Sequence, residues 1–103
     1  MSLAELLAEA AEELVDVSAT VAPTGGVLWD RTGRAFATAS ADGLSAEFRL
    51  DPAIAAAALR TPDTSHSGRG QDWVRFSPET LDDHALDRAE AWFGSAWRRA
   101  ERP

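Results

Sequence analysis

The chain has 103 residues, of which 45% are hydrophobic and 26% charged, with a net charge of −7 at pH 7 and no cysteine. These values predict one globular domain over residues 1–103, because a chain of this length can bury a single core unaided, and they exclude disulfides and cysteine metal sites. The negative charge opposes nonspecific DNA binding, which depends on neutralising phosphates.

The distribution of apolar and acidic residues favours a cytoplasmic protein with no membrane partner. No apolar run approaches the ~20 residues that span a bilayer. Residues 1–16 carry five acidic side chains and no arginine, unlike the basic start of a signal peptide. All ten basic residues are arginine, which, with the many alanines, is typical of a GC-rich genome rather than of selection for guanidinium chemistry.

The first element that the pattern predicts is a helix beginning at Ser2. Ser2 and Glu5 have the spacing of a capping box, in which each side chain accepts a hydrogen bond from the other residue's backbone amide. The apolar residues that follow recur at helical spacing and form one expected buried face: Leu3, Leu6, Leu7, Ala10 and Leu14.

Strands follow where the apolar period changes to two residues. Residues 17–21 and 27–29 predict two short strands, and residues 33–50 predict a β-hairpin whose tight primed turn is Asp42-Gly43. After that turn, four apolar residues alternate with polar ones and are expected to be buried: Leu44, Ala46, Phe48 and Leu50.

Two further helices and one strand are predicted in the second half of the chain. Asp51-Pro52 begins a short helix that ends near Arg60, residues 61–72 form a long polar loop, and residues 73–76 form a fifth strand. Ser77-Pro78 caps a last helix, which starts between residues 78 and 83 and ends near Arg99. The predicted fold is α+β: an antiparallel β-meander of about five strands, with an N-terminal helix, a short middle helix and a long C-terminal helix packed mainly on one face.

Two clusters of polar residues raise the question of catalysis. Ser65 and His66 lie in the polar loop, but neighbours in a glycine-flanked loop do not supply the rigid nucleophile–base pair that a hydrolase needs. His84 and Asp87 lie about one helical turn apart, without a further histidine nearby to complete a metal site. A hydrolase is therefore the least supported function, and we expect no catalytic residue and no metal.

Arginine and tryptophan side chains are the candidate contact residues. Arg31 and Arg34 flank one hairpin turn, and Arg49 and Arg75 are expected on the outer face of the sheet. If these arginines lie next to one another in the fold, they form an anion-binding patch. If they instead pair with acids such as Glu47, they form an ordinary solvated surface, and this is the interpretation that we favour. On the last helix Trp92 and Trp97 point in different directions, so one of them is expected to be more exposed and to mark an interaction or dimer surface.

The segments GRAFATAS, LSAEFRLDP, AALRTP and DWVRFSPETLDDHALDRAEAWFGSAW, in this order, resemble the YjbR/MmcQ-like family over nearly the whole chain. The family's strand of the form G-K-x-F-A is matched by residues 33–37, and its tryptophan-led strand by Trp73-Val74. The resemblance implies a cytoplasmic protein that binds DNA through a paired-wing arrangement and has no cofactor. Where family members carry lysine and histidine before the tryptophan, this chain has Gly70-Gln71-Asp72. A luciferase-like family of unknown function has a similar helix-and-strand tail.

The function that we predict is a non-enzymatic binding module, which recognises a protein partner or a small ligand through loop 61–72 and the neighbouring sheet. The residues expected to bind are Arg69, His66, Trp73 and Arg34. The alternative is weak DNA binding by Arg31, Arg34, Arg49 and Arg75, which the acidic charge disfavours. No motif identifies the ligand or partner, no cofactor is expected, and the pattern fits a monomer or a weak dimer.

Overall fold

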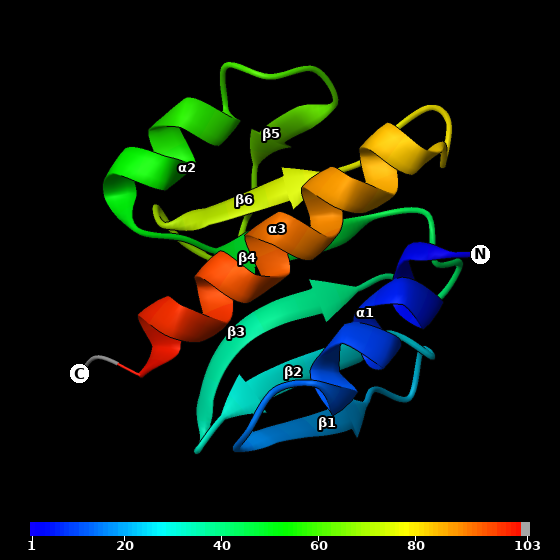
Figure 1. Ribbon diagram of the computed structural model, residues 1–103, viewed down its shortest axis with the longest axis vertical. Helices are drawn as coiled ribbons and strands as arrows, with labels where there is room; N and C mark the ends of the chain where they lie inside the picture. Colours follow the sequence, from blue (N-terminus) through cyan, green and yellow to red (C-terminus); the bar gives the residue numbers. More distant parts are fainter. Residues whose placement is uncertain (102–103) are drawn as a thin grey trace.

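The computed structural model describes residues 1–101 and places three helices against one side of a six-stranded antiparallel sheet (Figure 1). In chain order the elements are α1 (Leu3–Glu12), β1 (Val17–Val21), β2 (Val27–Arg31), β3 (Arg34–Ala39), β4 (Ala46–Arg49), α2 (Pro52–Ala58), β5 (Thr64–His66), β6 (Trp73–Phe76) and α3 (Asp83–Ala100). The strand order is β1-β2-β3-β4-β6-β5, so β1 and β5 are the two edges. The predicted α+β class and the three helices are confirmed, but the sheet has six strands rather than about five.

The additional strand, β5, lies inside the segment that the sequence predicts to be a polar loop. Its residues Thr64, Ser65 and His66 pair with Phe76, Arg75 and Val74 of β6. Because these side chains lie at the edge of the sheet and are exposed or only partly buried, the segment lacks the alternation of apolar and polar residues by which a strand is predicted. Only the backbone pairing with β6 makes this segment a strand.

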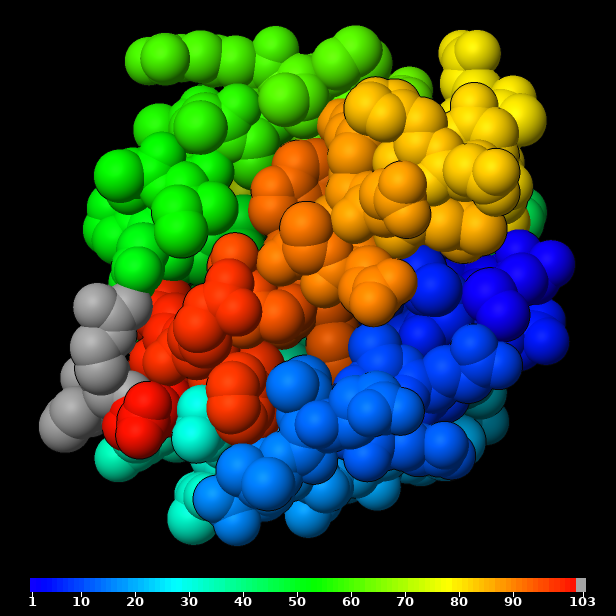
Figure 2. Space-filling view, viewed as in Figure 1, coloured from blue at the N-terminus to red at the C-terminus, as the bar shows by residue number. Residues whose placement is uncertain are grey.

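The hydrophobic core lies between the helices and one face of the sheet. Phe93 of α3 is fully buried, with its ring centroid 5.4 Å from that of Trp29 and 5.2 Å from that of Phe36. Burying each such side chain stabilises the fold by about 1.5–3 kcal/mol. Figure 2 shows α3 and α1 side by side over this face, where α1 contributes its buried residues Leu3, Leu6 and Leu7.

The connection between β3 and β4 is wider than the predicted primed turn at Asp42-Gly43. Of these two residues only Gly43 has a positive φ, 74°. The Asp42 carboxylate accepts hydrogen bonds from the Ser40 hydroxyl (2.5 Å) and the Leu44 amide (2.9 Å), which stabilises the longer loop. Leu44 therefore lies in the loop and is 54% exposed, so the prediction that it is buried is wrong. The other three residues of that pattern are buried: Ala46, Phe48 and Leu50.

The helix α3 begins at Asp83, within the predicted range of residues 78–83, but its cap differs from the prediction. Asp82, rather than Ser77-Pro78, is the N-cap, and its carboxylate accepts a hydrogen bond from the amide of Ala85 at 2.9 Å. The carboxylate satisfies an amide that has no partner within the helix. No helix in the described part of the chain is long and apolar enough to cross a membrane.

The tryptophans of α3 do not divide into one buried and one exposed side chain, because both are partly buried. The guanidinium carbon of Arg88 lies 5.1 Å from the ring centroid of Trp92, and that of Arg31 lies 3.9 Å from the ring centroid of Trp97. The indole of Trp97 also donates a hydrogen bond to the carbonyl of Val15 at 3.0 Å. Each ring is thus covered by an arginine, and neither is left as an open aromatic patch.

Gly43 is predicted to be the glycine least tolerant of substitution. A Cβ at this position would lie 2.6 Å from the Cβ of Ser2, and the backbone has φ +74°. We expect Gly43→Ala to lower the free energy of unfolding by about 1–3 kcal/mol through left-handed strain alone, with the clash adding to this loss. Urea denaturation followed by tryptophan fluorescence measures the change.

Two other glycines provide matched controls for this measurement. Gly33 has φ +86° but no atom within 4 Å of an added Cβ, so Gly33→Ala should show the strain without the clash. Gly68 has neither feature, and Gly68→Ala should change stability little. Equal losses for Gly43→Ala and Gly33→Ala would contradict the proposed contact with Ser2.

Candidate functional site

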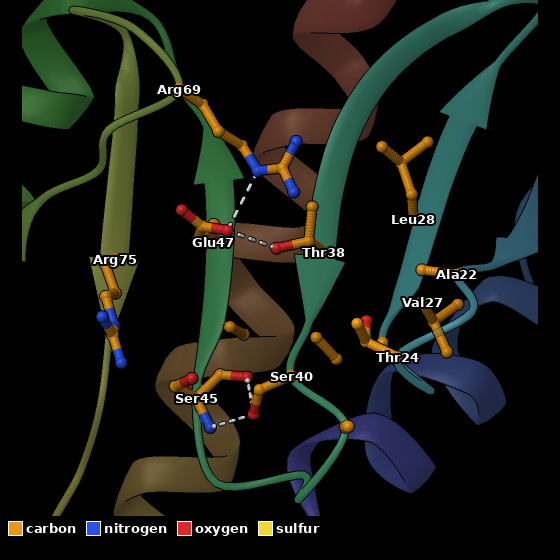
Figure 3. A pocket seen from close by; sticks show the side chains of 14 residues that line it. Ala22, Thr24, Val27, Leu28, Thr38, Ser40, Ser45, Glu47, Arg69 and Arg75 are labelled. Atoms are coloured by element: carbon orange, nitrogen blue, oxygen red, sulfur yellow. Dashed lines mark hydrogen bonds and ion pairs between the residues drawn. The ribbon is translucent and has the colours of Figure 1, made fainter.

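The face of the sheet opposite the helices is open, and its side chains come from alternate residues of the strands (Figure 3). One row of cross-strand neighbours runs from Leu28 through Thr38 and Glu47 to Arg75. This face contains a hollow of about 440 Å³, which we call the open-face hollow. Thr38, Glu47, Arg69 and Arg75 supply polar groups to it, and Leu28 and Ala22 belong to its apolar part.

Glu47 is the hydrogen-bonding centre of the open-face hollow. Its Oε1 atom accepts from the Thr38 hydroxyl at 2.9 Å and from Nε of Arg69 at 3.0 Å, and its Oε2 atom accepts from the Ser67 hydroxyl. Burial raises the pKa of this carboxyl group, but the hydrogen bonds from Ser67, Arg69 and Thr38 together outweigh burial and hold the pKa below the usual 4.5. Both carboxylate oxygens are therefore engaged by the protein itself.

The segment between β5 and β6 folds across this face and covers Trp73. The Ser67 amide donates to the carbonyl of Trp73 at 3.2 Å, and the guanidinium carbon of Arg69 lies 5.6 Å from the centroid of the Trp73 ring. Trp73 is only 9% exposed as a result. At the end of the segment, Asp72 accepts a hydrogen bond from Nη2 of Arg99 at 2.6 Å, which ties the loop to α3.

Two arginines on the open face lack a hydrogen bond or ion pair to the described residues. Within residues 1–101, neither Arg49 nor Arg75 forms a hydrogen bond or an ion pair, although Arg75 is the cross-strand neighbour of Glu47. Glu47 pairs instead with Arg69, which comes from the loop. The sequence-based interpretation that Glu47 pairs with Arg49 and Arg75 is therefore not what the structure shows. The ionisable groups lining the open-face hollow are two arginines and one carboxylate, a local excess of positive charge.

The structure divides the residues predicted to bind into two groups. Arg69, Trp73, Arg49 and Arg75 share the open face. His66 does not join them, because it is the cross-strand neighbour of the core residue Val74 and its side chain points to the helical side of the sheet. Ser65 and His66 thus point to opposite faces, which separates the two groups that a hydrolase would need together.

Arg31 and Arg34 lie on the helical side and hold the C-terminal end of α3. Nη1 of Arg31 donates to the carbonyl of Trp97 at 3.0 Å, and Nη1 of Arg34 donates to the carbonyls of Ala100 (3.1 Å) and Glu101 (3.0 Å). The last carbonyls of a helix have no partner within it and carry partial negative charge. The four arginines predicted to contact DNA are therefore not one patch.

Sequence reasoning did not single out Thr38, it considered Ser67 only within the polar loop 61–72, and it treated Glu47 only as a partner for other charges. One signal was present: Glu47 is the only acid in the strand segment AEFRL, between the apolar Ala46 and Phe48. A carboxylate in the middle of a central strand needs donors from its neighbours. Ser67 and Arg69, two residues apart in the loop, supply them.

No three histidine, aspartate or glutamate side chains in the part of the chain that the structure describes lie together as a metal site. No family model matches the chain, and no curated protein and no solved structure matches it. The resemblance to the YjbR/MmcQ-like family stays a prediction.

Arg31→Ala and Arg34→Ala are predicted to affect stability rather than the open face. Each removes hydrogen bonds to carbonyls of α3, which contribute about 0.5–1.5 kcal/mol each. We expect a lower free energy of unfolding and faster amide exchange near residues 97–101. Arg75→Ala, which removes an arginine without a hydrogen bond or ion pair in residues 1–101, is the control and should leave stability within about 0.5 kcal/mol. An equal loss in all three variants would contradict this assignment.

The Glu47 network is predicted to open in acid. Because the pKa of Glu47 is lowered by folding, the carboxylate contributes stability above the usual glutamate pKa, and this contribution is lost as the pH falls through the lowered value. An NMR titration should show the Glu47 carboxyl carbon and the amides of Ser67 and Arg69 changing at one midpoint below 4.5.

Glu47→Gln is the control for this titration, because it keeps the shape and removes the ionisable group. Its loop amides should show no such midpoint. A Glu47 midpoint at or above 4.5 would show that the hydrogen bonds do not outweigh burial.

Proposed function

We propose that this protein is a non-enzymatic binding module that takes up a small anionic molecule in the open-face hollow. The observation that carries the proposal is the pair of guanidinium groups, Arg69 and Arg75, beside a hollow of about 440 Å³. Sites for small molecules are commonly concave, with volumes of about 300–1,000 Å³, apolar walls and a few polar groups. The open-face hollow has this composition.

The charges favour an anion. Arg75 has no hydrogen bond or ion pair within residues 1–101, and Arg69 uses only Nε for Glu47, which leaves its two Nη groups for another acceptor. The oxygens of Glu47 already accept from Thr38, Ser67 and Arg69. A carboxylate or phosphate group matches the fork of a guanidinium.

The part of the open-face hollow away from the arginines is apolar, which favours a ligand that has an apolar portion besides its acidic group. Leu28, the cross-strand neighbour of Thr38, is partly exposed on this face, and Ala22 of the turn between β1 and β2 lies beside it (Figure 3). Covering such side chains removes apolar area from water, at about 25 cal/mol per Å². The ligand class is therefore a small molecule with one acidic group and a short apolar body.

DNA binding is the second candidate, and the unpaired arginines Arg49 and Arg75 are the observation that favours it. Arg31 and Arg34 are already committed to the carbonyls of α3. Few cations then remain for phosphates on a chain of net charge −7. The concave open-face hollow suits a small molecule better than a duplex.

The predicted ligand class is tested with matched probes in a ¹H–¹⁵N NMR titration. Octanoate and phenyl phosphate should shift amides around the open-face hollow, whereas octanol and octylamine should bind more weakly. Losing one charge-assisted hydrogen bond costs about 1.5–3 kcal/mol, so Arg69→Gln and Arg75→Gln should each weaken octanoate binding about tenfold or more. Arg60→Gln removes the same charge from an exposed position two residues after α2 and is the control.

A short DNA duplex in the same titration separates the two candidates. Duplex binding that falls steeply with salt, without a response to octanoate, would favour the DNA function and contradict the small-ligand proposal. Equal binding of octanoate and octylamine would contradict the role of the arginines.

A further inference from the structure

β1 is an edge strand without the features that usually protect edges. It lies at one end of the strand order, and four of its five residues are exposed. Val17–Val21 contains no charged residue and no proline, and its pairing with β2 has no bulge. Proteins commonly use such features to prevent edge-to-edge pairing. The other edge, β5, has only three residues, and a short edge strand is itself protective.

The hydrogen bonds to β2 show which backbone groups of β1 face outward. The amide of Ala22 donates to Gly26 at 2.7 Å, and the carbonyl of Asp16 accepts from Thr32 at 3.2 Å. Even-numbered positions therefore exchange hydrogen bonds with β2 in this antiparallel ladder. By alternation, the outward amides and carbonyls belong to the odd-numbered residues: Val17, Ala19 and Val21.

The strand is complementary to itself in this register. Val-Ser-Ala-Thr-Val has a valine at each end, a hydroxyl residue at each inner position and Ala19 at its centre. A two-fold axis at Ala19 pairs Val17 with the second copy's Val21, and Ala19 with its own counterpart. These are the residues whose backbone groups face outward, so each pair can exchange two hydrogen bonds.

The side chains also match across this axis. Val17 lies opposite a valine on the helical side, and Ser18 lies opposite a threonine on the open side. Pairs of β-branched and of hydroxyl side chains stabilise antiparallel strands by about 0.2–1 kcal/mol each. Val21 is 68% exposed, and pairing would cover part of it.

We propose that two copies of the chain associate through β1, antiparallel, with Ala19 on the two-fold axis, to form one sheet that continues through both copies. The contact is the same patch on both copies, so it closes at a dimer and does not propagate. One five-residue edge buries less than the roughly 1,200–2,000 Å² of a stable interface. The dimer is therefore weak and depends on protein concentration.

The net charge of the chain determines how dimerisation depends on salt. Each copy carries −7, and Asp16 and the acidic end of α1 (Glu12 and Glu13) lie next to β1 in the chain. Repulsion between the copies is screened by salt, so association strengthens as salt rises. Anion binding by Arg69 and Arg75 weakens with salt, which separates the two properties.

Sedimentation velocity from about 10 µM to about 1 mM protein, at about 50 and 500 mM NaCl, tests the proposal. We expect a monomer–dimer equilibrium that shifts toward dimer at high salt. In amide exchange, protection of Val17, Ala19 and Val21 should rise with protein concentration. A chain that stays monomeric at the highest concentration in both salts overturns the proposal.

Ala19→Lys identifies the surface, because it places two like charges across the axis and should weaken association about tenfold or more. Ala19 is exposed, so the lysine can be accommodated in the folded chain, which an NMR spectrum checks. Ala53→Lys makes the same change at an exposed position of α2, away from β1 (Figure 1), and should leave association unchanged. Association that survives Ala19→Lys, or that Ala53→Lys weakens equally, overturns β1 as the interface.

Discussion

The rest of the molecule depends on the packing of Phe93 between Trp29 and Phe36, which holds α3 against the sheet. The apolar side chains of the strands face this helix, and α1 packs beside it. On the other face of the sheet Glu47 is partly buried, and a buried carboxylate needs hydrogen-bond donors. The network around Glu47 supplies them, and it gives the open face a defined shape without help from the core.

The arginines differ in role: some stabilise the fold, and others are left available to bind a ligand. Arg31 and Arg34 hold carbonyls of α3, and Arg88 donates to the Thr61 hydroxyl and the Pro62 carbonyl, at 2.8 Å in each case. These guanidinium groups are occupied because the fold places carbonyl or hydroxyl oxygens within their reach. Arg75 forms no hydrogen bond or ion pair within residues 1–101, because its cross-strand neighbour Glu47 is engaged by Thr38, Ser67 and Arg69. In a chain without lysine, position in the fold rather than residue type distinguishes an arginine that stabilises from one that binds.

Sequence patterns predicted the elements that depend on interactions between residues close together in the chain. The capping box of Ser2 and Glu5 forms, and the strands at 17–21 and 73–76 have the predicted bounds. β5 and the exposed Leu44 were missed because they depend on backbone pairing and loop hydrogen bonds that side-chain periodicity does not report. For the site, Arg69 was expected on the binding loop and Trp73 at the start of the neighbouring strand. The role of Glu47 was not found, because its donor Arg69 lies 22 residues away in the chain.

The position of α3 after all six strands has a consequence for synthesis on the ribosome. Until residues 83–100 have emerged, Trp29 and Phe36 lack the Phe93 ring that packs against them, and the edge of β1 is unpaired. Exposed apolar faces and unpaired strand edges are the features that make incomplete chains aggregate. The nascent protein is therefore most vulnerable just before its longest helix is complete, and a chaperone that shields an apolar sheet face at that stage would raise its folding yield.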